Sequence, residues 1–138
     1  MMAVNLRGVF LACKVVLPAM RARRFGRIIN IASGTVFSGP ATRIHYVTSK
    51  AGVLGFTRTL AREVGAHGIT VNTIAPGMID TERLRSVPGV RDVSLIPLGR
   101  VGDPAEIAAV ACFLASDRAG YVTGAVVPVD GGLTRNLL

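Results

Sequence analysis

Two residues of the segment YVTSK are suited to chemistry together: the phenol of Tyr46 and the ammonium of Lys50. They are four residues apart, so on a helix their side chains lie one turn apart on the same face. An ammonium about 5 Å from a phenolate, at an effective dielectric constant of about 20, stabilises the charged phenolate by about 3 kcal/mol. Such a pair could give and take a proton. The competing interpretation is an ordinary pair of surface side chains that occurs by chance.

The pair needs a helix that holds both side chains, and the surrounding sequence predicts one. In residues 45–64, Val47, Ala51 and Leu54 recur at helical spacing beside a second apolar stripe. Because so much of its circumference is apolar, we expect this helix to be buried on more than one side. Residues 5–23 predict another helix, which Pro18 is expected to bend.

Short apolar segments alternate with the predicted helices. A third long helix is predicted from Asp103 to about Ser116, because Asp103, Pro104 and Glu106 have the spacing of a capping box. Residues 33–40 are predicted to be a loop, and residues 78–102 a long loop region with a short helix near 81–85. The predicted strands are residues 27–31, 70–74 and 125–129. The order indicates an α/β fold: the second half of a Rossmann-like, doubly wound parallel sheet, with about three strands and flanking helices.

Length and composition limit the classes of protein that fit. The 138 residues allow one domain at most, large enough to bury a core. Half of them are hydrophobic, yet no apolar run reaches the ~18 residues of a membrane-spanning helix, and the start MMAVNLRG lacks the features of a signal peptide. We therefore expect a cytoplasmic protein that does not enter a membrane, and the apolar excess indicates buried subunit interfaces.

The net charge of +8 raises the question of nucleic-acid binding. The densest basic group, between Arg21 and Arg27, falls where a helix ends, and cations there complement the helix dipole. No aromatic residues are interleaved for base stacking, so we expect no nucleic-acid partner. Cys13 and Cys112 each lie in an apolar helical pattern without nearby ligand residues, which predicts reduced core side chains and no metal site.

Several separate motifs, in order, resemble one family of enzymes. From Val4 to Gly132 the chain resembles the C-terminal half of a short-chain dehydrogenase/reductase. The pattern is most similar to that of the 3-oxoacyl-carrier-protein reductases. The motifs that carry the resemblance are VNLRGVF, RIINIAS, YVTSKAG, VNTIAPG, PLGRVGDPAEIA and TGAVVPVDGG.

The resemblance implies hydride transfer between NAD or NADP and a ketone or secondary alcohol, with Tyr46 as the acid and base. The catalytic residues it implies are Asn5, Ser33, Tyr46 and Lys50. Ser33 would hydrogen-bond the substrate oxygen, and Asn5 would support a water that relays protons to the lysine. An ordinary loop serine and a helix cap are the competing interpretations of Ser33 and Asn5.

The resemblance also implies a cofactor site and an assembly. Its cofactor-binding residues would be Tyr46, Lys50, Pro76, Gly77, Ile79 and Thr81. A plain turn after a strand is the competing interpretation of the Pro-Gly segment. No glycine-rich phosphate loop follows any predicted strand, so the choice between NAD and NADP is not readable.

We expect residues 1–138 to form a single partial Rossmann domain that lacks the nucleotide-binding half and, alone, binds cofactor no better than millimolar. The family implies a homo-oligomer, a dimer or a tetramer. The alternative function is a cofactor-incompetent fragment that keeps only the oligomerisation surfaces. For the substrate, Arg24 matches one of two basic residues that hold the carrier protein in the resembling reductases, whereas His67 stands in place of the second.

Overall fold

The computed structural model describes residues 1–86 and 92–134. The chain alternates helices and strands as the sequence predicts, with most boundaries within one or two residues of the predicted ones. The long helices are α1 (Gly8–Arg23), α3 (Ile44–Val64) and α5 (Pro104–Ala115), and the strands are β1 (Gly26–Ile31), β2 (Ile69–Pro76) and β3 (Val126–Val129). Shorter elements are a π-helical turn (Ala3–Arg7), α2 (Thr35–Ser38), α4 (Glu82–Arg85) and the 3-10 turns Gly65–His67 and Asp117–Ala119.

The three strands form one parallel sheet in the order β1-β2-β3. Strand β2 lies in the centre, and its register runs from Gly26 opposite Ile69 to Ile31 opposite Ile74 on one side. On its other side, β3 pairs with residues 73–76 of β2. Within the described residues β1 pairs with β2 alone, so its outer edge carries unpaired backbone groups. The predicted α/β class and parallel sheet are confirmed.

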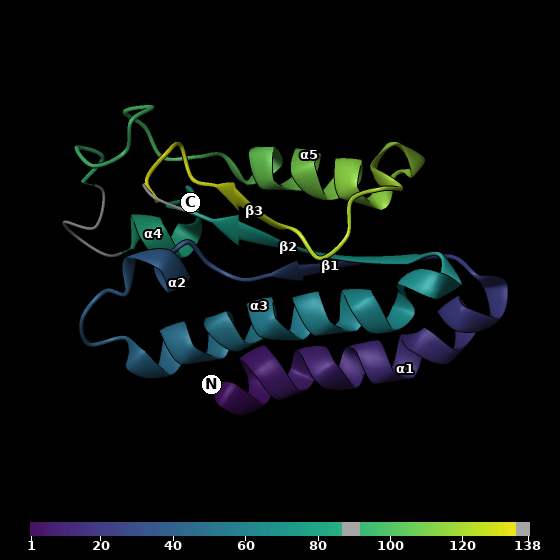
Figure 1. Cartoon of the computed structure of the whole chain (residues 1–138). Coiled ribbons are helices and arrows are strands. Elements are labelled where there is room, and N and C mark those ends of the chain that lie inside the picture. The colour runs from purple at the N-terminus through teal and green to yellow at the C-terminus, as the bar shows by residue number, and fades with distance from the viewer. Residues whose placement is uncertain (87–91, 135–138) are drawn as a thin grey trace.

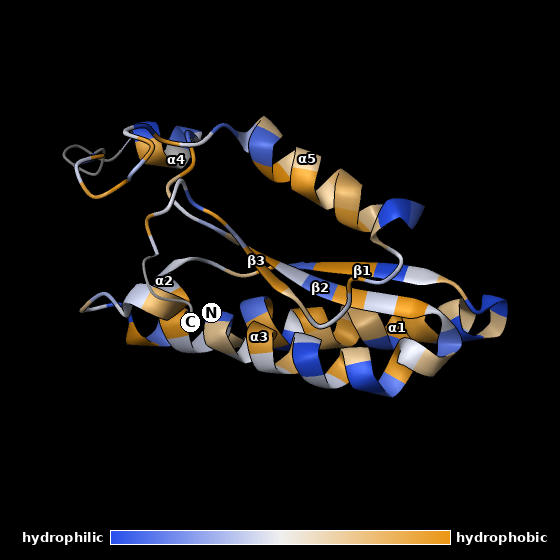
Figure 2. Ribbon diagram, turned by 45° about the horizontal axis from the view of Figure 1, so that its top comes forward, coloured by the Kyte–Doolittle hydropathy of each residue, from blue (hydrophilic) through white to orange (hydrophobic). Residues whose placement is uncertain are grey.

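Helices cover both faces of the sheet. Figure 1 shows α1 and α3 side by side beneath the strands and α5 above them, and Figure 2 shows hydrophobic residues along the strands between these layers. The connection from β1 to β2 passes through α3, and that from β2 to β3 passes through α5 on the opposite face. Both connections move to the next strand in the same direction across the sheet, but their helices lie on opposite faces. One crossover is therefore right-handed and the other left-handed, and the left-handed one departs from the usual rule.

Two apolar clusters form the core, one on each face of the sheet. Beneath it, Cys13 of α1 and Val64 of α3 pack with Val71 of β2. Above it, Leu114 of α5 packs with Ile74 of β2. These contacts explain why α3, as predicted, is buried on more than one side: one flank faces the sheet and another faces α1.

A buried polar cluster ties α3 to the sheet. Thr57 is fully buried in α3, and its hydroxyl oxygen accepts from Asn30 Nδ2 of β1 at 2.8 Å and from Thr73 Oγ1 of β2 at 2.7 Å. These bonds lie inside the α3 face of the sheet, where an unpaired polar group would be costly. They fix the position of α3 across both strands.

The local signals at the helix ends behave as the sequence predicts. Asp103 caps α5 by accepting from Ala105 N at 2.7 Å, and Glu106 reaches back to Asp103 N at 2.7 Å, which completes the capping box. After α3, Gly68 takes a positive φ of 70°, and a Cβ there would lie 2.5 Å from the Arg24 carbonyl oxygen. Glycine is therefore required where the chain turns from α3 into β2.

Two expectations about local structure are corrected. The tract predicted as a loop over residues 33–40 contains the helical turn α2, because Phe37 N bonds back to the Gly34 carbonyl at 3.0 Å. Cys112 is exposed, whereas Cys13 is buried as expected. The reason is that α5 packs only one stripe on the sheet, through Ile107, Val110 and Leu114, and Cys112 lies outside it.

The expectation that no segment is long and apolar enough to cross a membrane is also corrected. The continuous helix over residues 3–22 passes that test by length and composition, although core helices and signal sequences pass it as well. Only 6% of this stretch is buried within the chain. Phe10, Leu11, Val15 and Val16 are exposed on α1. These side chains form an exposed apolar face of α1.

Candidate active site

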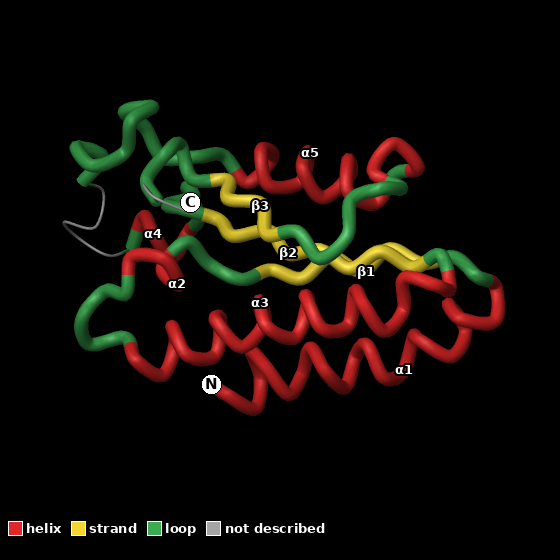
Figure 3. Tube along the Cα trace, viewed as in Figure 1, coloured by secondary structure: helices red, strands yellow, loops and turns green. Residues whose placement is uncertain are grey.

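The carboxyl ends of the strands and the start of α3 meet at one end of the molecule. Figure 1 shows the strand arrowheads, α2, α4 and the first turns of α3 at this end, and Figure 3 shows the long loops gathered there. Gly34 N, after β1, donates to the Pro76 carbonyl at 2.8 Å, and Gly77 N, after β2, donates to the Val129 carbonyl at 2.9 Å. These bonds fasten the loop after each strand to its neighbour. In parallel sheets this edge is where ligands bind.

Tyr46 and Lys50 lie on the first two turns of α3, and both are half-buried. Lys50 Nζ donates to the carbonyl oxygen of Ile31, the last residue of β1, at 2.9 Å. This bond brings the α3 pair to the strand end that precedes Ser33 by two residues. An ammonium has three donors, so two remain after this bond.

Asn5 is joined to the tyrosine through a serine that the sequence reasoning missed. Asn5 Nδ2 donates to Ser49 Oγ at 3.1 Å, and Ser49 Oγ donates to the Tyr46 carbonyl at 2.7 Å. Ser49 is fully buried, so both bonds are shielded from water. The N-cap of the first helical turn is Met2, so the interpretation of Asn5 as a helix cap is wrong.

Ser33 follows β1 directly and is half-buried. Its hydroxyl oxygen accepts from Thr35 N at 3.3 Å and from Thr35 Oγ1 at 2.9 Å. On either side of it, Ala32 N donates to the Ile74 carbonyl and Gly34 N to the Pro76 carbonyl, each at 2.8 Å. Ser33 therefore sits in a turn whose backbone is fixed to β2 at both ends.

The segment after β2 carries the remaining predicted residues, and it is held from two sides. A Cβ on Gly77 would lie 2.6 Å from Asp130 Cα, so only glycine allows this approach of two backbones. Ile79 forms a parallel bridge with Gly102, in which Asp80 N donates to the Gly102 carbonyl at 2.8 Å. The segment after β2 is thus extended and paired like a short strand at Ile79, rather than a plain turn.

Thr81 has a structural role at the end of this segment. It is the N-cap of α4, and its hydroxyl oxygen accepts from Leu84 N at 3.4 Å. Among the contacts of the described residues, none joins Thr81 or Ile79 to Tyr46, Lys50 or Ser33. Among the catalytic candidates, hydrogen bonds link Asn5 to the Tyr46 carbonyl through Ser49.

Asp130 organises the turn after β3. Its carboxylate accepts from Gly132 N at 2.9 Å, from Thr134 N at 2.8 Å and from the Thr134 hydroxyl. Partial burial acts to raise the pKa of Asp130, but the hydrogen bonds from Thr134 and Gly132 outweigh it and lower that pKa. The carboxylate is therefore a structural anion that closes the loop.

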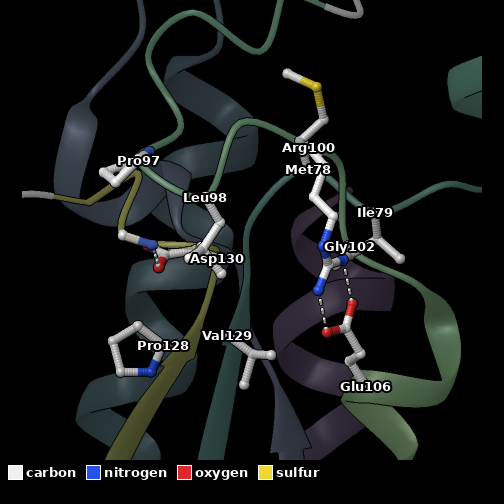
Figure 4. A pocket seen from close by; sticks show the side chains of 12 residues that line it. Met78, Ile79, Pro97, Leu98, Arg100, Gly102, Glu106, Pro128, Val129 and Asp130 are labelled. Carbon is white, nitrogen blue, oxygen red and sulfur yellow. Dashed lines mark hydrogen bonds and ion pairs between the residues drawn. The ribbon is translucent and has the colours of Figure 1, made fainter.

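A cavity of about 470 Å³ opens on the α5 side of this end. Figure 4 shows it between Leu98, Pro128 and Ile79, with the Arg100 guanidinium held on Glu106 by two hydrogen bonds of 2.8 and 2.7 Å. Ile79 is the one predicted site residue in its lining. The cavity is therefore separate from the catalytic candidates on α3.

Sequence reasoning missed the two hydroxyl residues that contact the catalytic candidates, Ser49 and Thr35. Ser49 lies inside the same YVTSK segment, one residue before Lys50, and helical spacing alone places its side chain beside that of Asn5 only once the packing of α1 on α3 is known. Thr35 follows Ser33 by two residues, a spacing at which hydroxyl turns form. That spacing was the available signal.

Comparison with known proteins places the chain in a family. Residues 1–134 match the family model described as Enoyl-(Acyl carrier protein) reductase. The chain is 52% identical over 132 residues to the 3-oxoacyl-(acyl-carrier-protein) reductase FabG of Pseudomonas aeruginosa, an alignment that covers 94% of this chain and 53% of the relative. It is 47% identical over 132 residues to the acetoacetyl-CoA reductase of Shinella zoogloeoides, covering 93% of this chain and 55% of the relative.

A third relative gives the same result. The FabG reductase of Thermotoga maritima is 46% identical over 133 residues, an alignment that covers 94% of this chain and 54% of the relative. The chain therefore spans about half the length of the curated relatives it matches. The resemblance recognised in the motifs is confirmed, and the chain belongs to the short-chain dehydrogenase/reductase family.

Proposed function

We propose that the protein containing this chain is an NAD(P)-dependent oxidoreductase that interconverts a ketone and a secondary alcohol. The observation that carries the proposal is the bond from Lys50 Nζ to the Ile31 carbonyl at 2.9 Å. It holds Lys50 of α3 against the end of β1, two residues before Ser33. In the proposed site, the acid Tyr46, the cation Lys50 and the hydroxyl donor Ser33 would act together at this edge of the sheet.

Each of these residues has a role that its chemistry supports. A nicotinamide bound at this edge would supply the hydride. Tyr46 donates a proton to the carbonyl oxygen as the alcohol forms, and Lys50 stabilises the phenolate that remains. Ser33 donates a hydrogen bond to the same oxygen as negative charge develops on it. Asn5 acts through Ser49, whose bond to the Tyr46 carbonyl steadies the first turn of α3.

The segment after β2 suits the nicotinamide end of the cofactor. In the bridge with Gly102, the flanking residues Met78 and Asp80 use their backbone groups toward Gly102. Backbone groups alternate along an extended chain, so the N–H and C=O of Ile79 face the opposite way. They are a donor and an acceptor side by side, which is what a carboxamide needs. Tyr46, Lys50, Pro76, Gly77 and Thr81 would complete the cofactor contacts.

The substrate we propose is a 3-oxoacyl thioester. The relatives from Pseudomonas aeruginosa and Shinella zoogloeoides are named as reductases of 3-oxoacyl-carrier-protein and acetoacetyl-CoA. Arg24 is exposed, and its guanidinium donates to the Ala66 carbonyl at 2.8 Å, directly before His67. The two positions at which the resembling reductases hold the acidic carrier protein are therefore adjacent here, with an arginine at one and a histidine at the other.

The test is reduction of acetoacetyl-CoA followed by the fluorescence of NADPH, and separately of NADH. The chain has no Trp, so protein emission does not interfere. Two forms are compared: residues 1–138, and a fusion that adds the amino-terminal half of the Pseudomonas relative. Tyr46→Phe should lower the rate of the active form by at least about 100-fold, since it removes the proton donor.

Tyr121→Phe is the matched control, because it makes the same chemical change at a fully exposed tyrosine that is not part of the proposed site. It should leave the rate unchanged. If neither form reduces the substrate with either cofactor, or if Tyr46→Phe is as active as Tyr121→Phe, the proposed reaction is wrong.

The alternative function is assembly without catalysis, and the exposed apolar face of α1 favours it. Phe10, Leu11, Val15 and Val16 are uncovered on this helix, which supports a homo-oligomer under either function. Sedimentation of the purified chain should give a dimer or tetramer, and Val15→Lys should shift it toward monomer. An assembled chain that is inactive in both forms above would favour this alternative.

A further inference from the structure

The hydroxyl oxygen of Ser33 receives two hydrogen bonds from a single neighbour. Thr35 donates to it from its backbone N–H at 3.3 Å and from its side-chain hydroxyl at 2.9 Å. We propose that Thr35 is a positioning residue that commits the Ser33 hydroxyl to act as a donor toward the substrate oxygen. This inference rests on the proposed function and names a further residue of that site.

The number of hydrogen bonds that a hydroxyl group can make is limited. The group has one O–H donor and two acceptor lone pairs. In Ser33 both lone pairs face donors from Thr35, so the remaining capacity of the group is its own O–H. A hydroxyl free to rotate would divide its time between giving and accepting. Here Thr35 removes that choice.

The backbone around Ser33 leaves the side chain as the only adjustable part. Ala32 N bonds to the Ile74 carbonyl and Gly34 N to the Pro76 carbonyl, each at 2.8 Å. A Cβ on Gly34 would lie 3.3 Å from the Pro76 carbonyl oxygen, so the turn is already close against β2. With the backbone fixed, the bonds from Thr35 select the rotamer of Ser33.

The arrangement matters most when charge develops on the substrate. A carbonyl oxygen is only an acceptor, and it becomes more negative as hydride arrives. A chain of hydrogen bonds from Thr35 through Ser33 to that oxygen polarises each member in the same direction. The effect is therefore expected on the rate of the chemical step more than on substrate binding.

A merely structural role is the competing explanation, because the same contacts join Ser33 to Thr35, the first residue of α2. The two roles separate by substitution. Thr35→Val keeps the shape and the backbone N–H but removes the hydroxyl donor, whereas Thr35→Ser keeps the donor. Thr59→Val, on the exposed side of α3, is the matched control for the change itself.

The experiment measures kcat and KM for these variants in whichever form of the protein is active. Thr35→Val should lower kcat by about 3- to 10-fold with KM unchanged, while Thr35→Ser and Thr59→Val stay within about twofold of the parent. In the Ser33→Ala background, adding Thr35→Val should cost nothing further, because Thr35 acts through Ser33. Thr35→Cys replaces Thr35→Val if the valine variant does not fold.

Three results would overturn the inference: an unchanged kcat in Thr35→Val, an equal loss in Thr35→Ser, or a full additional loss in the Ser33→Ala background. A rise in KM alone would also count against it. An inactive parent protein refutes the proposed function instead, so the two failures are distinguishable.

Discussion

The substitution Thr57→Val tests the polar cluster that joins α3 to the sheet. Thr57 is fully buried, and its hydroxyl oxygen is the acceptor for Asn30 Nδ2 and Thr73 Oγ1 at 2.8 and 2.7 Å. Valine has nearly the same shape as threonine, so the change creates no cavity. It removes the acceptor and leaves a buried amide donor and a buried hydroxyl without their shared partner.

The expected cost follows from those two stranded groups. Leaving a buried polar group unpaired costs about 1–3 kcal/mol. Because the hydroxyl of Thr73 can rotate but the amide of Asn30 cannot, we take about 3 kcal/mol for the pair together. For a chain of this length, 1 kcal/mol corresponds to roughly 4 °C in Tm, so Thr57→Val should melt about 12 °C lower.

Urea unfolding followed by circular dichroism gives the free energy directly. Thr59→Val is the control, because Thr59 lies two residues away on the exposed side of the same helix. It should change stability by less than about 0.5 kcal/mol. Adding Thr73→Val to Thr57→Val removes one of the stranded groups, so the double variant should cost less than the sum of the two single changes. A loss in Thr57→Val no larger than that of Thr59→Val would refute the reasoning.

Three further outcomes are expected. Gly55→Ala should raise the free energy of unfolding by about 0.5–1 kcal/mol, since a Cβ there meets nothing within 4 Å, whereas Gly77→Ala should lower it by about 2 kcal/mol because its Cβ meets backbone at 2.6 Å; equal urea midpoints would contradict both. Hydrogen bonds from the Arg100 side chain and from the Asp103 backbone N–H lower the pKa of Glu106 from 4.5 to about 2. The ionised Glu106 therefore stabilises the fold above pH 4.5, and this contribution disappears as the pH falls toward 2. The Tm difference between the parent and Glu106→Gln should therefore close on acidification, and a constant difference would count against it. Cys112 should react with Ellman's reagent in the folded chain, whereas Cys13, whose pKa burial raises, should react only after unfolding; early labelling at Cys13 would show that the core is wrongly placed.

Local sequence signals predict the helices and strands of this fold because each signal is formed by residues that are close together in the sequence. The capping box at Asp103 lies within four residues, and it begins α5 where expected. The period of Val47, Ala51 and Leu54 predicts α3, since each helical turn repeats the same contact with the core. The alternation of helices and strands predicts the parallel pairing that the sheet shows.

The contacts of the candidate site were beyond such signals because they join distant residues. The bond between Asn5 and Ser49 spans 44 positions, and it exists only because α1 packs on α3. The bridge from Ile79 to Gly102 depends on the path of a long loop that has no periodic pattern. Cys112 was misplaced for a similar reason: α5 is apolar nearly all round, so its pattern does not tell which stripe meets the sheet.

The central position of β2 has a consequence for how the fold opens. Residues 69–75 are all buried, with β1 on one edge, β3 on the other and helices over both faces. Amide protons there cannot reach solvent unless the whole sheet comes apart, so their exchange with deuterium reports the global unfolding free energy. Amides of β3, which pairs over only four positions, can be released by a smaller opening. The turn that holds Ser33 is bonded to β2 through Ala32 N and Gly34 N, so these amides should exchange as slowly as those of β2. The Gly77 amide, which donates to Val129 of β3, should exchange with the faster class of β3.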